Sequence, residues 1–257
     1  MEVYLIGAGN LATHLGKALA EAGHTVVGVY SRTVLSAETL ATALHCEATT
    51  SLDNVSGGAD VYVIAVKDAV LTEVAVKLAK RFPESLLVHT AGSMPMDTIP
   101  AARRGVLYPM QTFSRNRAVD FRRIPCFVEA SSQEDRGLLL DLASSMSELV
   151  YEADGEQRKY LHLSAVFCCN FVNHCYTLAE KLLTEHGELP FDTMLPLIDE
   201  TARKIHELMP HEAQTGPAVR WDTNVIEKQK QLLADTPELQ NIYEVMSESI
   251  HAAVTAV

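Results

Sequence analysis

The first residues of the chain that could do chemistry are small ones, in the run Gly-Ala-Gly-Asn-Leu-Ala that starts at Gly7. Gly7 would allow a tight turn, Gly9 would let a pyrophosphate approach the backbone, and Ala12 would let a helix pack closely on a strand. An apolar run precedes these residues and a helical pattern of leucines follows them. A turn of small residues without a ligand is the alternative, but the strand–turn–helix context favours a dinucleotide site. Gly7, Gly9, Asn10 and Leu11 are therefore predicted to bind the phosphates at a helix N-terminus.

The end of the second apolar run, residues 24–30, indicates which dinucleotide binds. An enzyme that prefers NAD usually has an acidic residue here for the ribose diol, whereas an arginine accommodates the 2′-phosphate of NADP. The sequence has Ser31, Arg32 and Thr33, which offer a guanidinium and two hydroxyls and no acid. Arg32 as a solvated charge is the alternative, but the set as a whole favours NADP as the cofactor.

Three later apolar runs end in residues that could complete the same site. Ala65 and Val66 end one run, His89 and Thr90 end the next, and Tyr108 ends the third. In an open parallel sheet, ligands bind beyond the carboxyl ends of the strands. We therefore expect the first four residues to contact the cofactor and Tyr108 to lie beside them.

His89 and Tyr108 are also candidates for moving a proton. His89 would titrate near neutral pH and act as an acid or a base. It could equally hydrogen-bond the turn at residues 90–93. Tyr108 would line a substrate pocket, and a half-buried tyrosine at a strand end is at least as well supported.

Two polar residues in the second half of the chain are candidates for substrate contacts. Asn170 lies on a long predicted helix, residues 156–186, and a buried amide there needs partners at both ends. We expect Asn170 to orient a substrate; His162 could share its face, although such a histidine is more often a satisfied helix residue. Arg220 would grip a substrate carboxylate with two hydrogen bonds, or would pair with Asp222.

An alternating β/α series must position the first group of these residues. It predicts an α/β fold over residues 1–153, a Rossmann-type, doubly wound and mainly parallel sheet. Residues 154–257 are predicted to form an all-helical substrate and dimerisation domain. Its long helix carries no fixed charge from Leu161 to Ala179, but polar residues within that stretch argue against a membrane span. A core helix shared with a second subunit, in a homodimer, is expected instead.

Composition narrows the function and the compartment. The 257 residues include 21 basic and 33 acidic side chains, and the net charge of −12 argues against a nucleic-acid partner. Five cysteines without metal-ligand spacing predict reduced thiols, no metal and a cytoplasmic location. The first residues show no basic region before an apolar run, so no signal peptide is expected. A basic loop, interpreted as solvated, contains Arg115, Arg117, Arg122 and Arg123.

Six motifs together carry a resemblance to a known group of proteins. They are, in chain order, GAGNLA, VYSRT, IAVKD, HTAGS, YPMQTF and TGPAVRWD. Along nearly its full length the chain resembles the Rossmann-like oxidoreductases whose C-terminal half is classified as domain of unknown function 2520. More distantly it is similar to pyrroline-5-carboxylate reductase, prephenate dehydrogenase and 6-phosphogluconate dehydrogenase.

The resemblance implies an NADP-binding domain, a helical second domain like that of 6-phosphogluconate dehydrogenase, and a dimer built mainly through the helices. In the wider superfamily the long helix bears a substrate-orienting Lys or Asn, which here corresponds to Asn170. Tyr108 occupies the place where prephenate dehydrogenases have a histidine. Trp221 stands where relatives more often have glycine.

Two classes of function follow. The first is an NADP-dependent oxidoreductase that transfers a hydride between the nicotinamide and a small, anionic carbonyl or imine compound. The second is a non-catalytic NADP-binding sensor or regulatory protein. The long helix has lysines only near its ends, Lys159 and Lys181, and this keeps the second class open.

Overall fold

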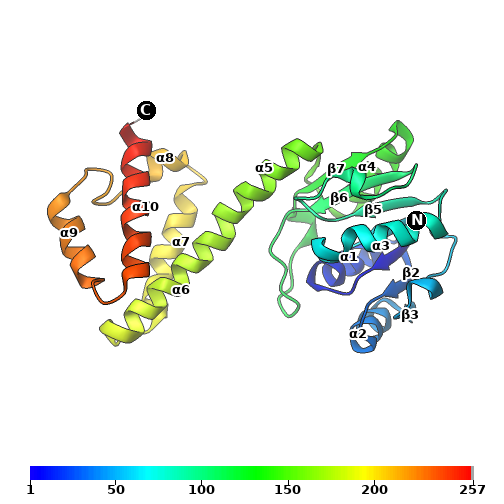
Figure 1. The fold of residues 1–257 in the computed structure, drawn as a ribbon, viewed down its shortest axis with the longest axis horizontal. Helices are drawn as coiled ribbons and strands as arrows, with labels where there is room; N and C mark the ends of the chain where they lie inside the picture. The colour runs from blue at the N-terminus through cyan, green and yellow to red at the C-terminus, as the bar shows by residue number, and fades with distance from the viewer. Residues whose placement is uncertain (256–257) are drawn as a thin grey trace. The chain divides into compact units, whose positions relative to one another are not determined.

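The computed structural model describes residues 1–255, and its first part is built on one eight-stranded sheet (Figure 1). The strands are β1 (Glu2–Ile6), β2 (Thr25–Tyr30), β3 (Glu47–Thr49), β4 (Val61–Ile64), β5 (Leu86–His89), β6 (Arg104–Pro109), β7 (Cys126–Ala130) and β8 (Val150–Glu152). Their order in the sheet is β3-β2-β1-β4-β5-β6-β7-β8. All neighbours are parallel except β6 and β7, which are antiparallel. The predicted Rossmann-type, mainly parallel sheet is confirmed.

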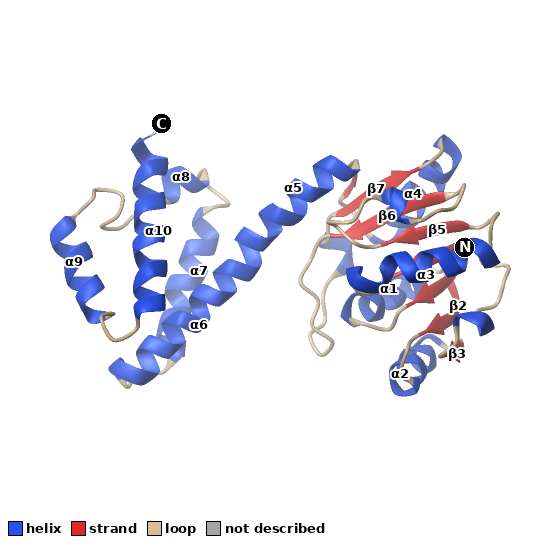
Figure 2. Cartoon of the chain, viewed as in Figure 1, coloured by secondary structure: helices blue, strands red, loops and turns tan. Residues whose placement is uncertain are grey.

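The apolar runs form strands because both faces of the sheet are covered. Every residue of β4 and of β5 is buried. The covering helices are α1 (Asn10–Glu21), α2 (Val34–Leu44), α3 (Asp68–Arg81) and α4 (Gln133–Met146). Buried residues of α1, α2 and α4 belong to one apolar cluster and those of α3 to a second, so the helices divide between the two faces (Figure 2). The chain therefore changes face between β1 and β4, and a crevice is expected at the carboxyl ends of these two strands.

From residue 155 onward the described chain is helical apart from its connections. The helices are α5 (Gly155–Ala165), α6 (Val172–Leu182), α7 (Leu195–Lys204), α8 (Pro210–Ala213), α9 (Thr223–Leu232) and α10 (Pro237–Thr255). The single helix expected at residues 156–186 is interrupted by two π-helical turns, Val166–Phe171 and Leu183–Gly187. No helix within residues 1–255 combines the length and the apolar character that a membrane crossing requires.

Two compact units divide the chain, Met1–Asn170 and Phe171–Val257. The change from sheet to helix falls between Glu152 and Gly155, close to the expected domain boundary after residue 153. The compact units divide later because residues of α5, among them Arg158 and Leu161, contact the sheet. The second unit has little interior of its own, since only Ala218, Ile226, Leu233 and Ser247 are buried among its described residues.

Trp221 has a backbone conformation that favours glycine, the residue that the resemblance implies at this position. Its φ of 49° lies in the left-handed region, which costs an L-residue roughly 1–2 kcal/mol and which glycine adopts freely. The indole ring stacks on His251 of α10, with ring centroids 4.8 Å apart. This contact offsets part of the backbone cost.

We expect Trp221→Gly to be more stable than Trp221→Ala by about 1 kcal/mol, because both lose the stacking and only glycine removes the strain. Urea unfolding of the two variants measures the difference. Lys228, in the middle of α9, is the matched control: there glycine should be less stable than alanine by about the same amount. Equal stability of the two Trp221 variants would contradict the strain.

Candidate functional site

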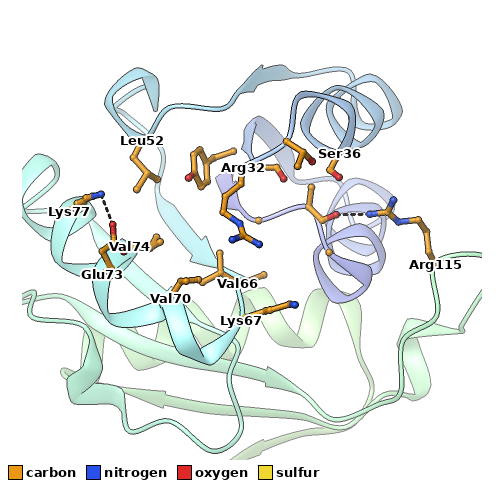
Figure 3. A pocket seen from close by; sticks show the side chains of 17 residues that line it. Arg32, Ser36, Leu52, Val66, Lys67, Val70, Glu73, Val74, Lys77 and Arg115 are labelled. Carbon is orange, nitrogen blue, oxygen red and sulfur yellow. Dashed lines mark hydrogen bonds and ion pairs between the residues drawn. The ribbon is translucent and has the colours of Figure 1, made fainter.

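A cavity of about 400 Å³ lies at the carboxyl ends of β1, β2 and β4, where the topology predicts a ligand (Figure 3). It is lined by Gly7, Ala8, Gly9, Tyr30, Ser31, Arg32, Thr33, Ser36, Leu52, Ala65, Val66, Lys67, Val70, Glu73, Val74, Lys77 and Arg115. All these residues belong to the first compact unit.

Most of the residues expected to bind the cofactor lie in the wall of this cavity. They are Gly7, Gly9, Ser31, Arg32, Thr33, Ala65 and Val66. Four others do not line it. Asn10 instead donates from Nδ2 to the carbonyl of Phe113 at 2.9 Å, Leu11 packs on the sheet, and His89 and Thr90 are buried.

The physical reason for glycine differs between positions 7 and 9. Gly7 has φ +127°, and a Cβ at this position would lie 2.2 Å from the Ala65 carbonyl oxygen, so both conformation and space demand glycine. Gly9 has an ordinary φ of −78°, and a Cβ there would meet no atom within 4 Å. Nothing within the described residues requires glycine at position 9. The open space beside it fits a phosphate that approaches the backbone.

The helix that begins after Gly9 leaves its first amides for a ligand. Gly9 is the N-cap of α1, and no side chain caps this helix. Its first N–H groups carry the positive end of the helix dipole and suit a pyrophosphate.

The end of β2 forms a second group of polar atoms. Arg32 projects into the middle of the cavity (Figure 3), and Ser31, Thr33 and Ser36 also line it. Thr33 is the N-cap of α2, yet its side chain makes no capping hydrogen bond. The guanidinium and the hydroxyls thus fit the 2′-phosphate of NADP, and the chemistry of the donor set agrees with the predicted cofactor.

The sequence reasoning missed one wall of the cavity, on α3. Val70, Val74 and Lys77 follow a helical spacing on the face directed at the cavity, and Lys67 precedes the helix. This spacing and the position of Lys67 directly after Val66 are signals that could have found them. Lys77 is paired with Glu73 at 2.6 Å.

Arg115 was also missed, because it belongs to the loop interpreted as solvated. Although exposed, it folds back to the glycine turn, and its Nη2 donates to the Ala8 carbonyl at 2.9 Å. The two residues are 107 positions apart, so no local pattern reveals the contact.

His89 has the local role that was considered beside catalysis. Its side chain is fully buried, Nδ1 accepts from the amide of Ala91 at 3.2 Å, and Nε2 lies 3.2 Å from the Pro95 carbonyl. Burial lowers the pKa of His89 to about 4, so the ring is neutral at neutral pH. Both ring nitrogens are occupied within the turn that follows β5.

Tyr108, in contrast, points its hydroxyl at a titratable group. The side chain is only 8% exposed, and its Oη lies 3.3 Å from Nδ1 of His162. Burial raises the pKa of Tyr108, so the phenol keeps its proton at neutral pH. A Cβ at Gly92 would come within 2.6 Å of the tyrosine ring, so this glycine makes room for Tyr108.

Helix α5 positions His162 through the buried Arg158. A capping box of Asp154 and Gln157 begins the helix. Arg158, one turn before His162, is fully buried, pairs with Glu129 of β7, and donates to the carbonyls of Ala153 and Met94 at 3.1 Å. This arginine fixes α5 against the sheet, so the tyrosine–histidine contact has a rigid frame.

The other two expected substrate residues lie in different compact units. Asn170 is exposed within the π-helical turn Val166–Phe171, a distortion that is frequent at functional sites. Arg220 is exposed, and within residues 1–255 it has no acidic partner at 4.0 Å or less. Asp222, considered as its partner, instead caps α9 by accepting from the amide of Val225 at 3.3 Å.

Comparisons with known proteins agree with this architecture. Residues 2–92 match the family described as NADP oxidoreductase coenzyme F420-dependent, and residues 124–250 match domain of unknown function 2520. A comparison of the sequence with curated proteins finds no match.

Three solved structures place the chain more closely. A protein of Bacteroides fragilis described as a "putative NADP oxidoreductase" is 53% identical, with 98% of each chain covered and a TM-score of 0.92. A pyrroline-5-carboxylate reductase of Coxiella burnetii has 16% identity and a TM-score of 0.59, with 99% of this chain and 97% of that chain covered. An imine reductase of Myxococcus stipitatus, solved with NADP⁺, has 12% identity and a TM-score of 0.67, with 100% and 93% covered. The last two are similar in fold.

The full-length match at 53% identity decides the family. The chain belongs to the NADP oxidoreductases that join a coenzyme F420-dependent-type NADP oxidoreductase domain to a DUF2520 domain.

Proposed function

We propose that this protein is an NADP-dependent enzyme that transfers a hydride between the nicotinamide and a small, anionic carbonyl or imine compound. The observation that carries the proposal is the cavity at the ends of β1, β2 and β4. It combines the open space at Gly9 with the guanidinium of Arg32 and the uncapped N-termini of α1 and α2. The family supports NADP, and the imine reductase with a similar fold was solved with NADP⁺.

Bound NADPH would supply the hydride, and the chain must supply the proton that balances the reduction. We assign that proton to Tyr108, whose raised pKa keeps the phenol protonated at neutral pH. As the substrate oxygen or nitrogen gains charge, the tyrosine O–H would donate its proton to it. The phenolate would then take a proton back from water, relayed through Nδ1 of His162 at 3.3 Å. The buried His89, with both nitrogens engaged, leaves this role to Tyr108.

Two residues are proposed to hold the substrate. Asn170 would orient the carbonyl or imine by hydrogen bonding, and the π-helical turn that contains it supports a functional role. Arg220 would bind an acidic group with two parallel hydrogen bonds, and among the described residues its guanidinium has no acidic partner that would have to be displaced.

Assembly as a homodimer through the helical part is also proposed. The second unit exposes a large share of its apolar side chains, among them Leu197, Ile205, Val245 and Met246. None of the residues of α6 is buried in the single chain. So much exposed apolar surface normally marks an interface, and a two-fold dimer is the commonest way to cover it. The five cysteines are free thiols, which supports a reducing compartment such as the cytoplasm.

The cofactor preference tests the first part of the proposal. Arg32→Ala should weaken NADPH binding on the order of ten- to a hundredfold, because a charge-assisted contact contributes about 1.5–3 kcal/mol, and should leave NADH binding unchanged. Calorimetric titration measures both affinities. Lys80→Ala, an exposed position of α3 outside the cavity, is the control. Equal affinity of the parent protein for NADPH and NADH would contradict the preference.

The chemical step is tested with a panel of keto and imino acids, by following the oxidation of NADPH. Tyr108→Phe should lower kcat about 10²- to 10⁴-fold and leave the Kd for NADPH unchanged, because only the proton donor is lost. Asn170→Ala should lower kcat, whereas Arg220→Ala should mainly raise KM. If NADPH binds tightly and no compound oxidises it, a non-catalytic sensor replaces the enzyme; a fully active Tyr108→Phe variant would remove the tyrosine from the mechanism.

The dimer is tested by light scattering at micromolar concentration, where the mass of two chains is expected. Val172→Glu, on the exposed face of α6, should shift the mass toward one chain because a buried charge at an interface is costly. Leu35→Glu, an equally apolar exposed site on α2, should leave the dimer intact. A monomer mass for the parent protein refutes the assembly.

A further inference from the structure

Arg115 lies outside both segments that match family models, residues 2–92 and 124–250. It lies in the segment between β6 and β7, after the part that matches the NADP oxidoreductase domain. Nevertheless it lines the cavity, and its Nη2 donates to the carbonyl of Ala8 in the glycine turn (Figure 3).

This segment is held against the glycine turn and the start of α1 by three successive residues, Phe113, Ser114 and Arg115. Asn10 donates to the carbonyl of Phe113 at 2.9 Å, and Nε2 of the buried His14 lies 3.0 Å from the carbonyl of Ser114. The imidazole of His14 also stacks on the Phe113 ring, with centroids 5.4 Å apart. Arg115 is therefore presented to the cavity by a fixed backbone.

The charges of the cavity leave Arg115 without an anion. The cavity is lined by four basic side chains and by Glu73 as its acidic one. Within residues 1–255, Glu73 pairs with Lys77, whereas Arg32, Lys67 and Arg115 have no carboxylate within 4.0 Å. One contact to Ala8 uses one of the five N–H groups of a guanidinium, so Arg115 retains donors for a ligand.

The three uncompensated cations match the three phosphates of NADP in number and place. Arg32 stands at the end of β2, on the side of the 2′-phosphate. Arg115 is bonded to the glycine turn, and Lys67, which follows Ala65 and Val66 at the end of β4, is the N-cap of α3. These two groups therefore border the place where a pyrophosphate would approach Gly9.

We propose that Arg115, together with Lys67, binds the pyrophosphate of the cofactor, so that the segment after β6 is a second phosphate-binding element of this protein. The inference rests on the proposed NADP site. It adds that affinity for the part common to NADP and NAD depends on Arg115, and that discrimination between them depends on Arg32.

Calorimetric titration of three probes separates these contributions. Arg115→Ala should weaken the binding of NADPH and of NADH by the same factor, on the order of tenfold. It should leave the affinity for adenosine 2′-monophosphate unchanged, because this compound has no pyrophosphate. Arg32→Ala should weaken the binding of NADPH and of adenosine 2′-monophosphate and leave the affinity for NADH unchanged. Arg117→Ala, two residues along the same segment and outside the cavity, should bind all three like the parent.

Arg115→Gln distinguishes charge from a structural contact. The amide can still donate to the Ala8 carbonyl, so recovery of parental affinity in this variant would mean that Arg115 only supports the glycine turn, and would overturn the inference. The inference would also be overturned if Arg115→Ala bound NADPH as tightly as the parent protein does, or if this variant lost the same affinity for all three probes. Lys67→Ala should repeat the pattern of Arg115→Ala. If the parent protein itself binds neither NADPH nor NADH, the proposed function fails instead.

Discussion

The close approach of Gly7 to Ala65 is the constraint on which the rest of the site depends. At φ +127° and with room for no Cβ, only glycine lets the turn after β1 pass against the end of β4. These two strands are neighbours whose following helices, α1 and α3, cover opposite faces of the sheet. The cavity exists because the turn lies close against the end of β4, between those helices. A side chain at position 7 would push the turn away from β4 and displace the amides of α1.

The parts of the fold and site that the sequence predicts are those with local causes. Strands that are buried on both faces consist of apolar runs in the sequence. The residue that ends each run indicates the edge of the sheet where a ligand binds. Ser31, Arg32, Ala65 and Val66 were found in this way. Arg115 could not be found, because backbone carbonyls hold its segment and a carbonyl has no sequence signature. The π-helical turns within residues 155–187 likewise follow from no pattern of residue types.

His89 and Tyr108 show the limit of the same reasoning. His89 is the last residue of β5 and Tyr108 the last but one of β6, and both were expected near the reacting centre. The turn after β5 folds over His89 and occupies both ring nitrogens, and desolvation then removes its charge. The same turn leaves room for Tyr108, because Gly92 has no Cβ that would occupy the space of the tyrosine ring. Its partner His162 depends in turn on Arg158, whose buried charge is tolerated only because Glu129 and two carbonyls compensate it.

The charge distribution of the chain is consistent with the proposal that several segments supply the phosphate contacts. The chain carries a net charge of −12, so its overall field opposes an anionic cofactor. Screening weakens that field beyond about 8–10 Å at physiological salt, and local contacts inside the cavity then decide binding. Arg32, Lys67 and Arg115 stand after β2, β4 and β6, and each would repel the others strongly if they followed one another along one element. Distributed over three segments around the N-terminus of α1, they concentrate positive charge only where the phosphates of a dinucleotide would lie.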